Sequence, residues 1–151
     1  MAHRAAANLP NLLAPVVLDV HMPVWPVKRA DAAVCINMIH ISPWAATEGL
    51  MRGAAALLAP GAPLYLYGPY VRQGVQTAPS NLEFDADLKR RNPAWGLRDL
   101  ADVAALAQAA VWRAGEAVCR RKERPPCLAE PGNSGLVLKG TAAGRPLCWP
   151  A

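Results

Sequence analysis

The stretch from Asp31 to Tyr70 reads DAAVCINMIHISPWAATEGLMRGAAALLAPGAPLYLYGPY, and it decides the fold. It predicts a strand at Ala32–Ile36, a helix from about Pro43 to Leu58, and a second strand at Leu64–Tyr67. Buried parallel strands are short, nearly continuous apolar runs, and a helix between two of them forms a right-handed crossover. The stretch therefore predicts an α/β fold built on a parallel sheet.

Polar and aromatic residues follow both predicted strands. Asn37 and His40 come after the first strand, and Tyr67 and Tyr70 lie at the end of the second. Ligands in open α/β sheets bind outside the carboxyl ends of the strands. We therefore expect these four residues to border a ligand crevice.

Five ordered phrases extend the pattern. They are CINMIHISPW (35–44), TEGL (47–50), LYGPY (66–70), SNLEFD (80–85) and RNPAWGLRD (91–99). Over residues 2–118 the chain resembles domain-of-unknown-function family 938, a methyltransferase-like family whose animal members are called methyltransferase-like protein 26. The resemblance implies a class I, Rossmann-like fold that uses S-adenosylmethionine. Walls of Tyr and Trp side chains would fit a small O- or N-methyl acceptor.

The resemblance also implies a site with two sides. A cofactor with an amino-acid group needs both a donor and an acceptor, and the Asn37 side chain offers both. His40 is the only candidate base, although a lone histidine beside apolar residues is more often structural. We place Asp19, Asn37, Met38 and Ile39 on the cofactor side, and His40, Trp44, Tyr67, Tyr70 and Asn81 on the substrate side.

Asp19 enters this set through a further predicted strand, Val16–Val20, in which it lies at the carboxyl end. Class I methyltransferases commonly place an acidic residue near this point to accept a hydrogen bond from the adenine amino group. The alternative is a solvated aspartate in a strand-to-loop turn. Position alone does not choose between the two, and the resemblance favours the first.

Two features of class I methyltransferases are missing upstream of Asp19. These are the Gly-rich turn under the methionyl end of the cofactor and the acid that holds the ribose. Comparison with the family predicts an N-terminally truncated, mostly parallel sheet with flanking helices, in which the Asp19 strand is an exposed edge open to self-association. We expect weak or absent cofactor binding. The alternative is a non-catalytic interaction protein, or truncated paralogue, that uses the same surface for a partner chain.

The rest of the chain predicts two more helices and an irregular end. The phrase Ser80-x-x-Glu83 matches a capping box before a helix at 81–91, and a second helix starts near Asp99. The family ends with an antiparallel strand pair, whose remnants we expect around 131–138. We assign residues 1–140 to the methyltransferase-like domain and 141–151 to a disordered tail.

Composition limits the other functions. A chain of 151 residues with 53% hydrophobic and 18% charged residues is one globular domain. It has no apolar run of the roughly 18 residues that span a bilayer and no convincing signal peptide, so we expect a cytoplasmic protein. Four cysteines without a CxxC pair predict no metal site.

The net charge of +5 is unevenly distributed along the chain. Residues 1–118 hold ten Lys/Arg against nine Asp/Glu, which gives +1, and residues 119–151 hold six against two, which gives +4. The basic run at 120–124 favours a solvated segment over an RNA contact. We therefore expect no nucleic-acid partner.

Overall fold

The structure is a computed structural model that describes residues 6–7, 9–110, 112–117 and 134–140. The strands are β1 (Ala33–Ile36), β2 (Pro63–Gly68), β3 (Tyr70–Val71), β4 (Arg98–Asp99), β5 (Trp112–Ala117) and β6 (Ser134–Gly140). The helices are the 3-10 turn η1 (Met38–His40) and the α-helices α2 (Trp44–Leu57), α3 (Pro79–Arg91) and α4 (Leu100–Ala109). Residues 141–151, assigned to a disordered tail, lie outside the described residues.

The main sheet has the strand order β1-β2-β6-β5. β1 runs parallel to β2, whereas β6 is antiparallel to both β2 and β5. The parallel β1–α2–β2 unit confirms the predicted crossover, and β5–β6 confirms the terminal antiparallel pair. A second, two-stranded sheet pairs β3 with β4 in parallel, with Tyr70 opposite Arg98.

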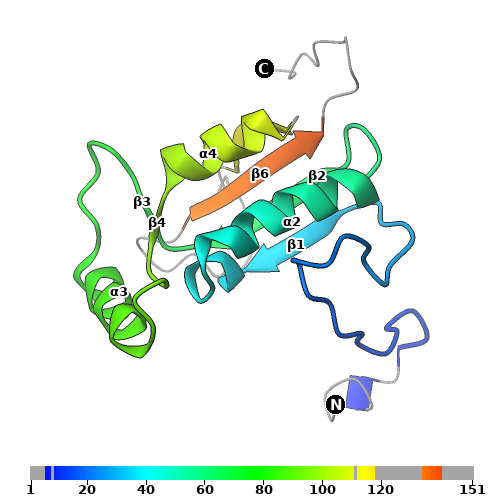
Figure 1. The fold of residues 1–151 in the computed structure, drawn as a ribbon, viewed down its shortest axis with the longest axis horizontal. Helices are drawn as coiled ribbons and strands as arrows, with labels where there is room; N and C mark the ends of the chain where they lie inside the picture. The colour runs from blue at the N-terminus through cyan, green and yellow to red at the C-terminus, as the bar shows by residue number, and fades with distance from the viewer. Residues whose placement is uncertain (1–5, 8, 111, 118–133, 141–151) are drawn as a thin grey trace, which may run out of the picture.

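Two helices cover one face of the main sheet, as Figure 1 shows for α2 and α4. Leu64 and Leu66 of β2 and Leu136 and Leu138 of β6 are buried on that face. They join one core with Leu50, Met51 and Ala54 of α2 and Val103 and Ala107 of α4. Trp112 closes the core from β5, and its indole nitrogen donates to the Met51 carbonyl at 3.3 Å. Hydrophobic burial of these side chains holds the helices on the sheet.

The opposite face is more open. Val34 and Ile36 of β1 are 64% and 60% exposed, and their cross-strand partners Tyr65 and Tyr67 are half-buried. The outer edge of β1 has no neighbouring strand among the described residues. β1 is therefore one edge strand of the sheet, and β5 is the other.

The predicted strand Val16–Val20 is wrong. The segment has no regular secondary structure, and Val17 is 95% exposed. A strand is stable only where a neighbour takes its backbone hydrogen bonds, and no strand of the described residues lies beside this segment. Apolar character alone therefore misled the prediction.

The capping box at Ser80 is also wrong. α3 begins at Pro79, and its N-cap residue, Ala78, makes no side-chain hydrogen bond. Proline fits the first turn of a helix because its φ is preset and it lacks the N–H that would go unpaired there. By contrast, α4 starts near Asp99, as predicted. The Asp99 side chain caps this helix by accepting a hydrogen bond from the Ala101 amide at 2.7 Å.

Candidate functional site

A short loop leaves the carboxyl end of β1 and borders the candidate site. We call residues 37–42 the crevice loop. Asn37 begins it with φ 58°, the one non-glycine residue of the described chain in the left-handed region. Its amide donates to the Tyr67 carbonyl at 2.9 Å, so the loop is tied to the end of β2. Asparagine tolerates this backbone conformation better than most residues.

The crevice loop turns the His40 ring onto β2 and β3. His40 is completely buried, and its ring meets Tyr70 edge-on with the centroids 5.0 Å apart. A Cβ added to Gly68 would overlap the His40 ring and would lie 3.0 Å from Asn37 Oδ1. The structure thus brings Asn37, His40 and Tyr70 together around Gly68.

This cluster contains polar atoms without partners. Asn37 Oδ1, both His40 ring nitrogens and the Tyr70 hydroxyl are buried and make no hydrogen bond within the described part of the chain. Buried polar groups are nearly always paired, and an unpaired one costs about 1–3 kcal/mol. The cluster therefore has unused hydrogen-bonding capacity.

Burial also sets the charge of the cluster. It lowers the pKa of His40 to about 4, and the nearby Arg98 charge acts in the same direction. Burial likewise raises the pKa of Tyr70. At neutral pH the imidazole and the phenol are both uncharged.

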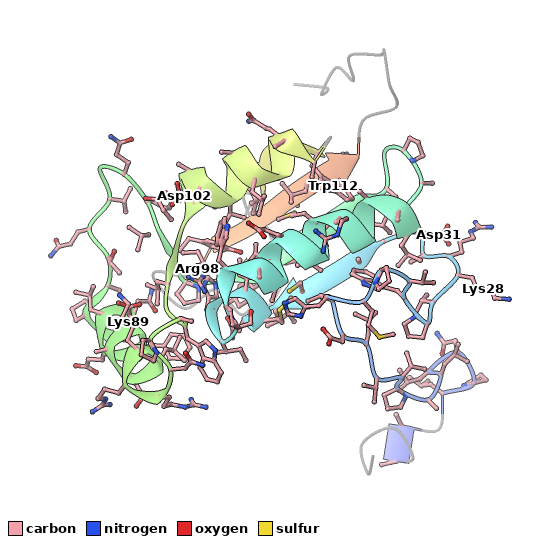
Figure 2. All side chains as sticks on the ribbon, in the orientation of Figure 1. Lys28, Asp31, Lys89, Arg98, Asp102 and Trp112 are labelled. Carbon is pink, nitrogen blue, oxygen red and sulfur yellow. The ribbon has the colours of Figure 1, made fainter. Side chains whose placement is uncertain are left out.

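The side chain of Arg98, in β4, donates hydrogen bonds to the crevice loop. Its Nε donates to the Ile39 carbonyl at 3.0 Å, and its Nη2 donates to the Ser42 carbonyl at 2.7 Å and the Ala94 carbonyl at 2.9 Å. The guanidinium carbon lies 5.8 Å from the centre of the Trp44 ring. Figure 2 shows Arg98 near the start of α2, where the crevice loop ends.

Side chains of α3 contact the segment that leads into β4. Asp85 accepts a hydrogen bond from the Leu97 amide at 2.8 Å and pairs with Lys89 at 2.6 Å. Arg91 stacks over Trp95, with 5.4 Å to the ring centre. The phrases around 35–44, 66–70, 80–85 and 91–99 are thus parts of one structural unit.

The other predicted site residues are more dispersed. Met38 is half-buried and accepts a hydrogen bond from the Ser42 hydroxyl at its carbonyl, at 2.7 Å. Ile39 is 1% exposed and belongs to the core. Trp44 and Tyr67 are half-buried, and Asn81 is half-buried on α3.

Asp19 lies in an exposed turn and not at the end of a strand. Its Oδ1 accepts a hydrogen bond from the His21 amide at 2.9 Å and contacts the His21 ring nitrogen at 2.9 Å. These hydrogen bonds lower the pKa of the carboxyl. Asp19 therefore does not end a strand, and its place on the cofactor side stays a prediction.

Arg98, Gly96 and Asp85 were missed as site-forming residues. The sequence pattern explained Asp85 by its spacing from Lys89, and that ion pair exists. Their long-range contacts join residues 12 to 59 positions apart, which no local pattern reveals. The only signal was that all three lie in the phrases that carry the family resemblance.

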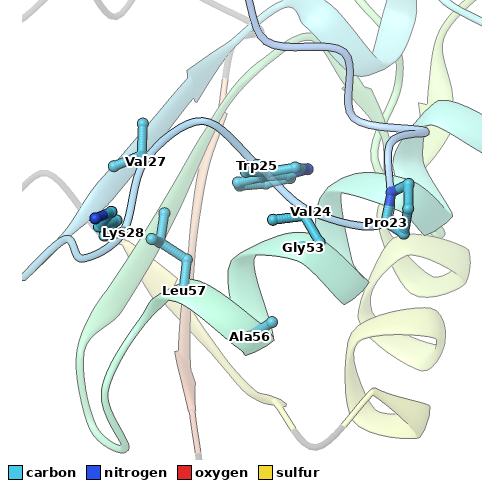
Figure 3. Close-up of a pocket in the computed structure, with 8 residues that line it drawn as sticks. All are labelled: Pro23, Val24, Trp25, Val27, Lys28, Gly53, Ala56 and Leu57. Atoms are coloured by element: carbon cyan, nitrogen blue, oxygen red, sulfur yellow. The ribbon is translucent and has the colours of Figure 1, made fainter.

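A separate pocket of about 340 Å³ lies between α2 and the loop before β1 (Figure 3). The Trp25 ring packs on Gly53, where any side chain would collide with it. None of the predicted site residues lines this pocket. It is lined by Pro23, Val24, Trp25, Val27, Lys28, Gly53, Ala56 and Leu57.

Comparison with solved structures places this fold among the Rossmann-like class I methyltransferases. The chain is similar to an O-methyltransferase family protein from Burkholderia thailandensis (TM-score 0.61, 14% identity, 94% of this chain and 39% of that one). It is also similar to the S-adenosylmethionine-dependent methyltransferase SibL (TM-score 0.68, 15% identity, 93% and 39%). Human N-acetylserotonin methyltransferase in complex with SAM gives a TM-score of 0.59 at 11% identity, with 78% and 31% covered.

The chain spans two fifths or less of the length of these structures. At such identities the likeness establishes the fold. The family itself is shown by a family model that matches residues 1–118. The chain belongs to the family described as protein of unknown function DUF938.

Proposed function

We propose that the chain is an S-adenosylmethionine-dependent methyltransferase-like protein whose crevice loop forms one wall of the cofactor site. The observation that carries the proposal is the buried, unpaired Asn37 Oδ1 at the carboxyl end of β1. It supports binding of a group with a hydrogen-bond donor, such as the amino-acid end of the cofactor.

The residues at the crevice fit this cofactor in part. Asn37 and the half-buried Met38 are available to it, whereas Ile39 supports the loop from the core. Asp19 lies in its own turn and has no described link to the crevice loop. We therefore propose weak cofactor binding by this chain.

S-adenosylmethionine, when bound, supplies a methyl group on a sulfonium, and the protein contributes mainly position. Trp44, Tyr67 and Tyr70 are the aromatic residues proposed to border a small O- or N-methyl acceptor. Asn81 would add a polar contact from α3. The acceptor class rests on the aromatic character of these walls.

His40 is the only candidate base on the proposed substrate side. Its imidazole is neutral at pH 7, but a pKa of about 4 makes it a weak proton acceptor. Its burial against Gly68 and Tyr70 favours a role in orienting neighbouring groups. An acceptor that must lose its proton before attack would gain little from it.

The test compares two variants by NMR titration with S-adenosylmethionine. Asn37→Ala should weaken binding by about 1–3 kcal/mol, because it removes the buried acceptor. His40→Ala should leave the affinity per folded molecule nearly unchanged. If both variants lose stability equally and neither changes affinity, the cofactor role of Asn37 is refuted.

A second candidate, a non-catalytic interaction protein, is favoured by a specific observation. Eleven of the fourteen large apolar side chains exposed in the described residues lie within 9–41, a range that includes the edge strand β1. β1 itself, with the sequence AVCI, contains no charge or proline that would block pairing. A second copy of this chain could pair there without any other partner.

No helix among the described residues combines the length and the apolar character that crossing a bilayer requires.

Sedimentation at increasing protein concentration tests the second candidate. Self-association that Ile36→Lys abolishes and Val75→Lys leaves intact would support it. Val75 is about as exposed as Ile36 but lies in the loop between β3 and α3, outside β1. A monomer at all concentrations would refute it.

A further inference from the structure

We propose that Arg98 is a positioning residue that holds the crevice loop in the geometry that brings Asn37 and His40 to Gly68. The meaning of this inference for catalysis rests on the proposed function. The structural claim stands on the contacts of Arg98 alone and is tested separately.

Arg98 binds backbone groups on both sides of the crevice-loop turn. Its donors go to the backbone carbonyls of Ile39, Ser42 and Ala94. Two of these carbonyls belong to the crevice loop, three residues apart. A guanidinium presents its donors in a rigid planar fork, so one side chain fixes the distance between both points. Lysine, with a single flexible ammonium group, cannot reproduce this geometry.

A second contact reinforces the first from the same segment. The Gly96 amide donates to the His40 carbonyl at 2.9 Å. Gly96 has φ 141°, and a Cβ there would lie 2.7 Å from Asp85 Oδ1, so glycine is required. The carbonyls of Ile39, His40 and Ser42 are therefore all bound by the segment 96–98.

The charge of Arg98 is not paired with a carboxylate in the described part of the chain. Burial lowers the pKa of Arg98, and the charge of Asp85 acts against this shift. The arginines of α3 behave differently: Arg90 and Arg91 are exposed and pair with Asp87. Arg98 thus crosslinks the backbone of the loop and does not serve as one half of an ion pair.

The register of the small sheet makes this crosslink relevant to the site. Arg98 lies opposite Tyr70 in the β3–β4 pair, and Tyr70 contacts the His40 ring. The same residue therefore meets the candidate site through its strand partner and through its side chain. Loss of the side chain should free the loop while the strand pair remains.

Hydrogen exchange of the His40 and Ile41 amides tests the proposal. These amides donate to the Asn37 and Met38 carbonyls and report on the loop directly. In Arg98→Ala we expect about tenfold faster exchange at both, with the β2 amides of Leu64 and Leu66 unchanged. In Arg98→Lys the two amides should exchange at a rate between those of Arg98→Ala and the unchanged chain. Arg91→Ala, which also removes an arginine stacked on a tryptophan, is the matched control and should exchange like the unchanged chain.

Two results would overturn the proposal: unchanged exchange at His40 and Ile41 in Arg98→Ala, or equal acceleration in β2, which would mean general destabilisation. Gly96→Ala provides a second variant that keeps the guanidinium, and it should loosen the same two amides. Titration of each folded variant with S-adenosylmethionine separates the two claims. If the unchanged chain shows no binding, the proposed function fails, while the exchange result still decides the role of Arg98.

Discussion

The His40 ring occupies the space that a side chain on Gly68 would need. The glycine at the end of β2 and the histidine after β1 are therefore coupled, although 28 positions separate them. The His40 ring therefore requires a residue without a side chain at position 68.

Gly68→Ala should consequently displace the His40 ring and destabilise the protein by about 1–3 kcal/mol, as overpacking in a tight core does. Urea unfolding followed by fluorescence measures this. Gly140→Ala is the matched control, because a Cβ there makes only an ordinary contact, 3.6 Å from the Trp112 ring. Equal stability of Gly68→Ala and the unchanged chain would contradict the packing described.

The pKa of His40 predicts how stability depends on pH. The folded protein holds the pKa at about 4, below the ordinary value of 6.5. Between these two pH values the unfolded chain binds more protons than the folded protein. The contribution of neutral His40 to the free energy of unfolding should therefore be fully present above pH 6.5 and be lost as the pH falls toward 4. The loss is on the order of 3 kcal/mol. Urea unfolding of the unchanged chain and of His40→Gln over this range measures it, and an identical pH dependence in both would rule out His40 as its source.

Asn37 offers a test of backbone strain. Its φ of 58° is costly for most residues, but glycine adopts it freely. Asn37→Ala should destabilise the protein by about 1 kcal/mol or more, whereas Asn37→Gly should be close to neutral. Thermal unfolding of both variants compares them. If alanine were tolerated as well as glycine, the left-handed conformation of residue 37 would be in doubt.

The central crossover was predictable because its signals are local. The apolar run of β1, the helical spacing of α2 and the stop at Pro60-Gly61 each act within a few residues. The start of α4 near Asp99 was predicted as well, and the structure shows that Asp99 is its N-cap residue. These elements matched the prediction within one or two residues.

The parts that failed depend on distant partners. Val16–Val20 has the apolar character of a strand, but pairing decides whether a strand forms. The candidate site shows the same limit, because Arg98 acts on carbonyls 56 and 59 positions earlier. Every residue has a backbone carbonyl, so the residue types do not show which carbonyls Arg98 binds.

The measurement that tests the account most directly is an NMR titration of the unchanged chain with S-adenosylmethionine, followed at every backbone amide. We predict weak binding, with a dissociation constant above about 100 µM (weaker than roughly −5.5 kcal/mol), and shifts confined to the crevice loop, Gly68 and Tyr70. Shifts absent from these residues, or centred instead on the Trp25 pocket, would contradict the proposed cofactor wall. Micromolar binding would contradict the proposal of weak binding, in which only Asn37 and Met38 of the predicted cofactor residues are available to the cofactor.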